Sequence, residues 1–290
     1  MSMPRLADVA TALPLHVQEV LTDESGPAPQ GEVFLLVHGY GGSSYTWHRW
    51  LPALARRGRV LQVDLKGFGG APKPDDGLYT PADLAELLLE LILEQDLRRV
   101  TMVGHSLGGG LSLLTALRLL DSGEDRLVRL VLVAAPAYRQ KLPPLVPLSR
   151  TPRLSQTLAR VVGIERIVAY VLRTIVFDTS TITREQLRAY CAGLESEGGL
   201  RAAMDVGRTI LPDDLDTIAR RYPEIDIPTL LLWGDHDRVI PLRIAHRLAE
   251  DLPQAHLSVI EECGHIPPEE RPDEAYAALA AFLDDTPLIN

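Results

Sequence analysis

The sequence predicts an α/β fold, in which helices cover both faces of a mostly parallel β-sheet and a helical insertion interrupts the alternation of strands and helices. Six short runs rich in Val, Ile and Leu are typical of buried parallel strands. Amphipathic patterns of helical period lie between most of these runs, as expected for a sheet with helices on both faces. The length of 290 residues suits one such domain with an insertion.

The predicted strands and helices alternate along the chain outside the insertion. Strands are expected at residues 33–39, 59–65, 98–106, 126–136, 228–235 and 256–262. Helices are expected at residues 80–97, 107–123, 243–252 and 273–285. Residues 12–22 carry a weaker signal for an antiparallel hairpin at the edge of the sheet.

One long interval, residues 137–224, contains no convincing buried strand and is predicted to be a helical cap domain. The core domain then comprises residues 1–136 and 225–290. The interval opens with a proline-rich stretch at 141–152 and has a basic first half, because residues 139–173 contain seven Lys or Arg and one acid. A solvated helix face is the favoured interpretation of this charge. Attraction of an anionic substrate or a membrane surface is the alternative.

The composition excludes several classes of protein. Apolar residues make up 46% and charged residues 23% of the chain, which is enough to bury a core and stay soluble. The net charge of −10 repels phosphate backbones, so no nucleic acid partner is expected. Two cysteines, Cys191 and Cys263, cannot form a disulfide framework, and both are expected to be small buried thiols. The N-terminus has no continuous apolar stretch, and glutamates break the most apolar helical run. We therefore expect a cytoplasmic protein with no stable membrane insertion.

The segment GHSLGG at 104–109 fits the pattern G-x-S-x-G, with Gly104, Ser106 and Gly108. It stands between a strong strand pattern and a strong helix pattern. A sharp turn between a strand and a helix lifts the side chain of its central residue into the open, and small residues two before and two after it avoid clashes. The N-terminus of the following helix directs N–H groups at the reacting oxygen. Ser106 is therefore the predicted nucleophile.

A serine hydroxyl needs a base to act as a nucleophile, and the base needs an orienting acid. The end of the fifth predicted strand offers Asp235 and Asp237, and the end of the last offers His265 directly after a glycine. His236 lies too early for the chain order serine, acid, histidine. His105 is expected to point away from the nucleophile. His265 is therefore the predicted base.

These motifs resemble those of the α/β-hydrolase superfamily, in particular its lid-bearing branch of serine esterases and lipases. An HG motif, a D-x-x-G-x-G loop, the serine elbow, a G-x-x-D-x-x-x-P segment and a GH segment occur in the family's order. The match covers nearly all of the chain outside the insertion. The resemblance implies the α/β-hydrolase fold with a helical lid. It also implies that Asp237, which fills the D of G-x-x-D, is the catalytic acid, and it leaves Asp235 to cap a turn.

The segment HGYGGSS at 38–44 follows the first clear strand and is a candidate for the oxyanion hole. Backbone N–H groups stabilise the charge that acyl transfer builds on a carbonyl oxygen. One donor is expected from Leu107, the residue after the nucleophile. The resemblance implies Tyr40, the residue after His-Gly, as the other. The Tyr40 side chain is expected to line or cover the acyl pocket, and His38 to brace the loop.

The residues and the resemblance together predict a carboxylic ester hydrolase. Ser106, His265 and Asp237 would act through an acyl-enzyme on a small hydrophobic ester-like substrate, without a metal or organic cofactor. Serine at position 106 argues against relatives that use an aspartate nucleophile. A carbon–carbon hydrolase of the meta-cleavage-product type stays open, although such enzymes commonly carry a tryptophan where this chain has Ile266. A triad-bearing receptor with little turnover is the other alternative.

Overall fold

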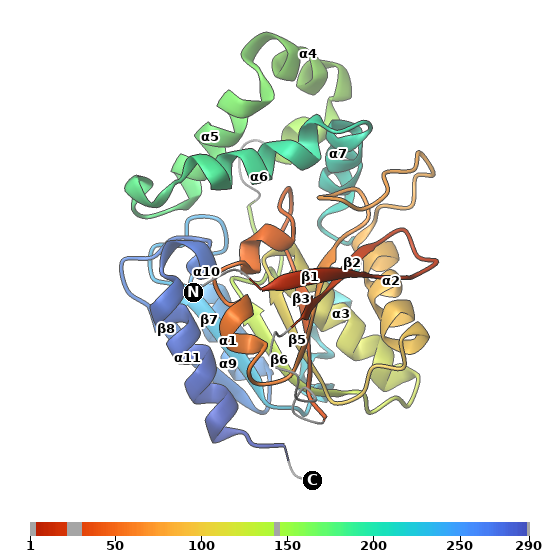
Figure 1. Cartoon of the computed structure of the whole chain (residues 1–290), viewed down its shortest axis with the longest axis vertical. Coiled ribbons are helices and arrows are strands. Elements are labelled where there is room, and N and C mark those ends of the chain that lie inside the picture. The colour runs from red at the N-terminus through yellow and green to blue at the C-terminus, as the bar shows by residue number, and fades with distance from the viewer. Residues whose placement is uncertain (1–3, 22–30, 142–145, 289–290) are drawn as a thin grey trace.

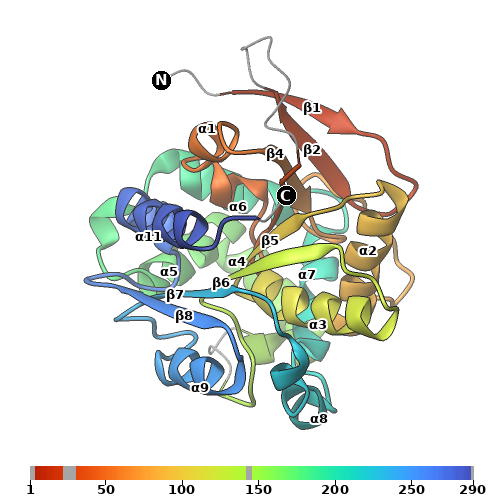
Figure 2. The ribbon, with the colours of Figure 1, turned by 90° about the horizontal axis from the view of Figure 1, so that it is seen from below.

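A computed structural model of the chain describes residues 4–21, 31–141 and 146–288. Its centre is an eight-stranded sheet in the order β1-β2-β4-β3-β5-β6-β7-β8 (Figures 1 and 2). The pairs β1·β2 and β2·β4 are antiparallel and all other neighbours are parallel. The strands are β1 (Arg5–Val9), β2 (His16–Leu21), β3 (Val33–Val37), β4 (Arg59–Asp64), β5 (Val100–His105), β6 (Leu127–Val133), β7 (Thr229–Gly234) and β8 (Ala255–Ile260).

The mostly parallel sheet confirms the predicted fold class. The six strands expected from apolar runs are β3 to β8, and β3, β5 and β7 are buried along their whole length. Such continuous burial follows from helices on both faces of a parallel sheet. The edge hairpin is also present, but it uses β1 as well as β2 and so begins nearer the N-terminus than predicted. Residue 22 of the expected hairpin lies outside the described residues.

Two layers of helices enclose the sheet (Figure 2). On one face, α2 (Pro81–Glu94), α3 (Leu107–Asp121) and α9 (Arg243–Asp251) pack into one apolar cluster with the sheet. On the other face, α1 (Leu51–Leu54) and α11 (Pro272–Asp285) pack into a second cluster. The short helix α10 (Pro267–Glu270) precedes α11. The layers hold the carboxyl ends of the parallel strands in fixed positions, which is where ligands bind in such sheets.

The helical insertion lies between β6 and β7, above one end of the sheet in Figure 1. Among the described residues between these strands, only helices occur as regular elements, as the sequence predicts. Ala219 and Tyr222 share the apolar cluster of the sheet. The division into a core and a cap domain at residues 137–224 stays a prediction, and residues 142–145 of the proline-rich stretch lie outside the described part. The helices are α4 (Pro152–Val162), α5 (Ile164–Ile175), α6 (Arg184–Glu195), α7 (Gly199–Thr209) and α8 (Leu215–Ala219).

Two predictions from composition can be compared with these elements. No helix within the described ranges is long and apolar enough to cross a membrane. Cys191 and Cys263 are both free and buried, in agreement with the expected small buried thiols. Burial raises the pKa of the Cys191 thiol to about 11. Burial also raises the pKa of the Cys263 thiol, so both thiols stay protonated near neutral pH.

Candidate active site

The turn from β5 into α3 holds Ser106 in an unusual backbone conformation, with φ 49° and ψ −120°. This positive φ is strained for a residue with a side chain. The flanking glycines have a steric reason. A Cβ on Gly104 would collide with the carbonyl oxygen of Gly108, and a Cβ on Gly108 would collide with that of Val37. The G-x-S-x-G pattern therefore lets the elbow pack against its own helix and against β3.

The three residues predicted to form a triad lie within hydrogen-bonding distance of one another. The Ser106 Oγ lies 2.9 Å from His265 Nε2, and His265 Nδ1 lies 2.8 Å from Asp237 Oδ2. The side chains of His265 and Asp237 are 6% and 0% exposed. They reach the serine from loops after β8 and β7, so three strand ends converge on one point. A proton can pass from the hydroxyl to the imidazole, and a carboxylate stands ready to stabilise the resulting imidazolium.

The two aspartates after β7 have different partners. The second carboxylate oxygen of Asp237 accepts hydrogen bonds from the backbone N–H groups of Val239 and Ile240, at 2.8 and 2.9 Å. Asp235 instead accepts from the backbone N–H of Cys263 and pairs with His236. Its role is thus to hold two loops together. Of the two carboxylates, only Asp237 contacts His265 among the recorded bonds.

His105 contributes to this site in a way that the sequence analysis missed. Its Nε2 lies 2.8 Å from the backbone oxygen of His265, and the two rings are 5.0 Å apart. Burial lowers the pKa of His105 to about 3, so the ring is neutral and donates from Nε2. Its Nδ1 has no hydrogen-bond partner among the described residues. No linear pattern signals this contact, because it joins the elbow to a segment about half the chain away.

The loop after β3 lies beside the elbow. The backbone N–H groups of Tyr40 and Leu107, the two predicted oxyanion donors, have no recorded acceptor within the described part of the chain. His38 braces this loop as expected. Its Nδ1 donates to the carbonyl oxygen of Gly39 at 2.7 Å, and its Nε2 accepts from the backbone N–H of Leu65 at 3.0 Å. Neither N–H group is thus engaged by another described residue.

The Tyr40 side chain connects the loop to the helical insertion. Its hydroxyl donates to the backbone oxygen of Ala203 on α7, at 2.8 Å. Burial raises the pKa of Tyr40 to about 12, which keeps the phenol protonated at physiological pH. The ring packs edge-on against Phe68, with the centroids 5.7 Å apart. The side chain therefore both lines and covers the space near Ser106.

A second contact joins the insertion to the segment around His265. The backbone N–H of His265 donates to the carbonyl oxygen of Ile175 at 2.8 Å. The buried carboxylate of Glu270 accepts from the backbone N–H of Phe177 at 2.7 Å and from that of Gly264. One side chain thus holds a residue of the insertion and the residue before His265.

The cavity at Ser106 is small and mostly uncharged. Its volume is about 40 Å³, which is enough for at least one water molecule. No Lys or Arg is among the described residues that line it. The lining residues are Gly39, Tyr40, Gly42, His105, Ser106, Ile175, Tyr190, His265 and Ile266.

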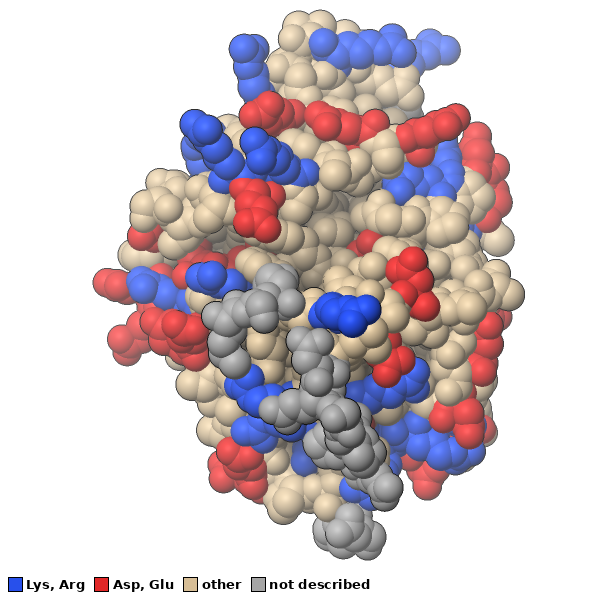
Figure 3. All heavy atoms as spheres, in the orientation of Figure 1, with Lys and Arg blue, Asp and Glu red and all other residues tan. Residues whose placement is uncertain are grey.

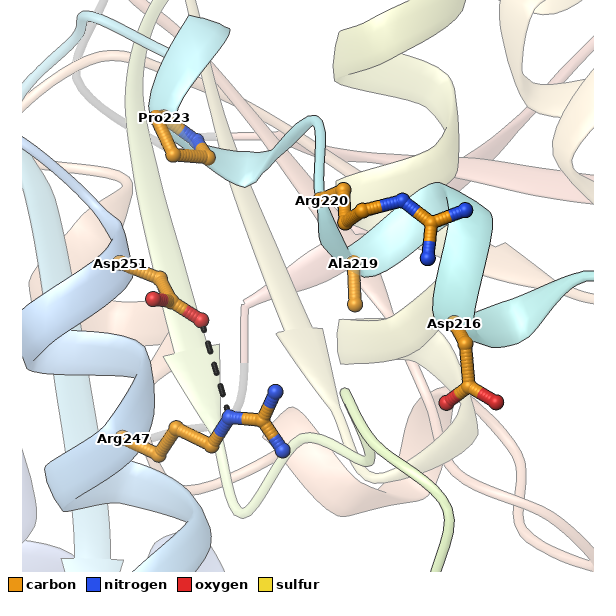
Figure 4. Close-up of a pocket in the computed structure, with 6 residues that line it drawn as sticks. All are labelled: Asp216, Ala219, Arg220, Pro223, Arg247 and Asp251. Atoms are coloured by element: carbon orange, nitrogen blue, oxygen red, sulfur yellow. Dashed lines mark ion pairs between the residues drawn. The ribbon is translucent and has the colours of Figure 1, made fainter.

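A larger hollow of about 290 Å³ lies elsewhere, between α8 and α9 (Figure 4). Arginines and aspartates line it, and Arg247 pairs with Asp251 across 3.8 Å. None of the residues around Ser106 takes part in it. The smaller cavity, which contains Ser106 and His265, is therefore the candidate active site. Within the described ranges, no group of three or more His, Cys, Asp or Glu side chains could hold a metal ion.

Comparison with known proteins identifies the class to which this fold and site belong. The model of the alpha/beta hydrolase family matches residues 34–279, so the chain belongs to that family. The chain is 26% identical to an alpha/beta hydrolase fold protein from Burkholderia ambifaria, with a TM-score of 0.77 and coverage of 97% of this chain and 99% of that one. The family membership confirms the α/β-hydrolase fold and indicates a hydrolase.

Two curated relatives have more specific names. The chain is 31% identical to a 2-hydroxy-6-oxononadienedioate/2-hydroxy-6-oxononatrienedioate hydrolase of Burkholderia vietnamiensis, over 81% of each chain. It is 28% identical to the pimeloyl-[acyl-carrier protein] methyl ester esterase of Aeromonas hydrophila, over 88% of this chain and 96% of that one. These relatives are named for different substrates, so the family alone leaves the bond that this chain cleaves undecided.

Proposed function

We propose that the chain is a serine hydrolase that cleaves carboxylic ester bonds through an acyl-enzyme. The observation that carries the proposal is the chain of two hydrogen bonds from Ser106 through His265 to Asp237, at 2.9 and 2.8 Å. Each group in this hydrogen-bonded chain is suited to its role in the reaction. The serine oxygen is aimed by the elbow, the imidazole is neutral when it accepts the serine proton, and the carboxylate keeps the ring in the required tautomer.

The proposed reaction has two halves. In the first, His265 Nε2 removes the hydroxyl proton as Ser106 Oγ attacks the ester carbonyl, and the same nitrogen then protonates the leaving alcohol. In the second, His265 activates a water molecule that attacks the acyl-enzyme and releases the acid. The free N–H groups of Tyr40 and Leu107 stabilise the oxyanion in both halves. A single donor of this kind is worth roughly 10²–10³-fold in kcat.

The lining of the cavity favours a small, neutral acyl group. The small volume of about 40 Å³ favours a short acyl group. Ile175 and Ile266 offer apolar contacts, and Tyr40 closes one side. A carboxylate on the substrate would lose hydration in this space without gaining a cationic partner from the described lining. These features support an uncharged short-chain ester.

A carbon–carbon hydrolase is the second candidate, because the relative from Burkholderia vietnamiensis is named for a dienedioate substrate. The same serine, histidine and aspartate would serve that reaction. The uncharged lining argues against a dianionic substrate, and the ester hydrolase is therefore preferred. A receptor with little turnover would use the same pocket and would differ in its steady-state rate.

Hydrolysis of p-nitrophenyl acetate by the purified protein and by Ser106→Ala tests the proposal. We expect steady turnover by the unaltered protein and loss of almost all of it in the variant, with unchanged far-UV circular dichroism. Full activity of Ser106→Ala would refute a serine nucleophile. A stoichiometric burst without further turnover would favour the receptor. Faster cleavage of a 2-hydroxy-6-oxodienoate than of any ester would favour the carbon–carbon hydrolase.

A further inference from the structure

The outer surface of α4 and α5 combines exposed apolar side chains with basic ones. Leu154, Val161 and Tyr170 are 55%, 76% and 59% exposed, which is unusual for large apolar residues. Arg153 and Arg160 on α4 are exposed as well. Figure 3 shows basic groups on both sides of a tan surface at the top of the molecule, which α4 forms in this view, and acidic groups directly below it.

The periodicity of α4 gathers these residues on one side. Leu154, Leu158 and Val161 are spaced by four and three residues, so they form one ridge along the helix. Arg153 and Arg160 are seven residues apart and lie beside that ridge. The same helix buries Ala159 on its inner side. One side of α4 therefore packs on the protein, and its exposed side carries both apolar and basic residues.

The neighbouring helix α5, which contacts α4, also has an exposed side that carries basic residues. Arg166, Tyr170 and Arg173 are spaced by four and three residues and are all exposed. Val168 and Leu172, on the opposite side of α5, are buried in a cluster with other residues of the insertion and with Ile266. The ion pairs recorded among the described residues involve none of the arginines at 153, 160, 166 and 173.

We propose that this docking face binds the surface of an anionic lipid bilayer. The docking face consists of Arg153, Leu154, Arg160, Val161, Arg166, Tyr170 and Arg173. Unpaired arginines attract anionic headgroups, and the apolar ridge between them can enter the boundary between headgroups and acyl chains. Tyrosine is suited to this boundary because its ring is apolar and its hydroxyl is polar.

The net charge of the chain limits which part of the protein can meet an anionic surface. The net charge is −10, so the protein as a whole is repelled by an anionic surface and only a local basic region can approach it. A second copy of the chain is a poorer occupant, because a two-fold contact would set arginines against arginines. Nucleic acid would satisfy the arginines but would leave the apolar ridge in water.

Binding to vesicles tests the proposal on the full chain. We expect the protein to co-sediment with vesicles of phosphatidylglycerol and phosphatidylcholine in equal parts, and not with vesicles of phosphatidylcholine alone. Raising the salt from about 0.02 M to about 0.5 M should release it, because the Debye length shortens several-fold. Each arginine near the surface is expected to strengthen binding by roughly fivefold.

Two double variants separate the charge from the apolar ridge. Arg153→Glu/Arg160→Glu and Leu154→Asp/Val161→Asp should each lower the partition coefficient at least about tenfold. Leu78→Asp is the matched control, since Leu78 is 56% exposed but lies outside the insertion, and it should bind like the unaltered protein. Equal melting temperatures and circular dichroism spectra establish that the variants fold.

Several outcomes would overturn the proposal. The first is no binding to anionic vesicles at low salt, and the second is equal binding by Arg153→Glu/Arg160→Glu and the unaltered protein. The third is that the unaltered protein does not bind vesicles but dimerises with rising concentration, as measured by light scattering, and that Leu154→Asp/Val161→Asp abolishes this dimerisation. That result would assign the face to self-association. The proposed ester hydrolysis is assayed separately with a soluble ester, so either proposal can fail alone.

Discussion

The backbone N–H of His265 donates to the carbonyl oxygen of Ile175, and this bond of 2.8 Å ties the proposed base to the helical insertion. Two residues further along the insertion, the N–H of Phe177 shares the carboxylate of Glu270 with Gly264. Because both contacts flank the imidazole, a shift of the insertion would move the ring relative to Ser106. The insertion therefore has a direct influence on the geometry of the site.

Glu270→Gln should weaken this connection. A carboxylate accepts at both oxygens, whereas an amide accepts at one and would turn its NH₂ group toward a backbone N–H. We expect the free energy of unfolding to fall by about 1–3 kcal/mol and kcat to fall with it. Urea titration and p-nitrophenyl acetate turnover measure the two effects. Glu261→Gln, at an exposed position nearby, is the control, and identical behaviour of both variants would rule out this role for Glu270.

Asp237→Asn should reduce kcat by roughly 10³–10⁴-fold, because the amide favours the wrong tautomer of His265. The amide oxygen of the variant can still accept from the backbone N–H groups of Val239 and Ile240, so we expect the variant to fold. Steady-state kinetics at fixed pH measure the loss. Asp235→Asn is the matched control and should retain most activity. A larger loss in Asp235→Asn would reassign the catalytic acid.

His105 makes the stability of the fold depend on pH. Burial lowers the pKa of this ring from the ordinary value of 6.5 to about 3, so between these pH values the unfolded chain binds a proton here that the folded chain does not. The free energy of unfolding should therefore fall as the pH falls below 6.5, by about 1.4 kcal/mol per pH unit.

Two histidine variants test this dependence. His105→Gln keeps a donor toward the backbone oxygen of His265 and cannot titrate, so its urea-unfolding free energy should lose less between pH 6.5 and pH 5. The exposed His246 provides the control, and His246→Gln should keep the slope of the unaltered protein. Equal slopes for His105→Gln and the unaltered protein would contradict the assignment of a neutral, buried ring.

The small cavity predicts a preference for short acyl chains. The kcat/KM for p-nitrophenyl esters should fall steeply from acetate to octanoate, because a longer chain exceeds a space of about 40 Å³. Ile266→Ala removes apolar atoms from the lining and should raise the ratio of octanoate to acetate activity. Ile218→Ala, on α8 and outside the lining, should leave that ratio unchanged. A flat chain-length series would show that the insertion opens freely.

The backbone at position 106 can be tested with a pair of variants. Alanine usually stabilises a protein relative to glycine by about 0.5–1 kcal/mol, but φ 49° favours glycine here. We expect Ser106→Gly to be at least as stable as Ser106→Ala by thermal unfolding. At Ser112, within the regular part of α3, the usual order should return. The usual order at both positions would contradict strain at the elbow.

Most of the fold could be predicted from the sequence because its signals are local. The runs that became β3 to β8 are apolar along their length, and burial on both faces requires that composition. β1 was harder to predict. Its residues are exposed or only partly buried at the edge of the sheet, and its sequence RLADV carries no continuous apolar run.

The residues of the candidate site also differ in how well the sequence predicts them. Ser106, Asp237 and His265 stand at strand ends within short motifs, so their proximity could be predicted before any coordinates. The roles of His105 and Glu270 could not, because each bonds to the backbone of a distant segment and a backbone group leaves no trace in the sequence. The size of the cavity also depends on how the insertion packs, which no single motif determines.

The strained turn at Ser106 also affects how this protein can change over evolutionary time. A serine at this φ costs about 1–3 kcal/mol, so mutations that favour stability alone would replace it with glycine. In the proposed function, the need for a hydroxyl at this position opposes that replacement. Retention of serine at the elbow is thus a compromise between stability and activity, and lineages that lose the reaction are expected to lose this residue early.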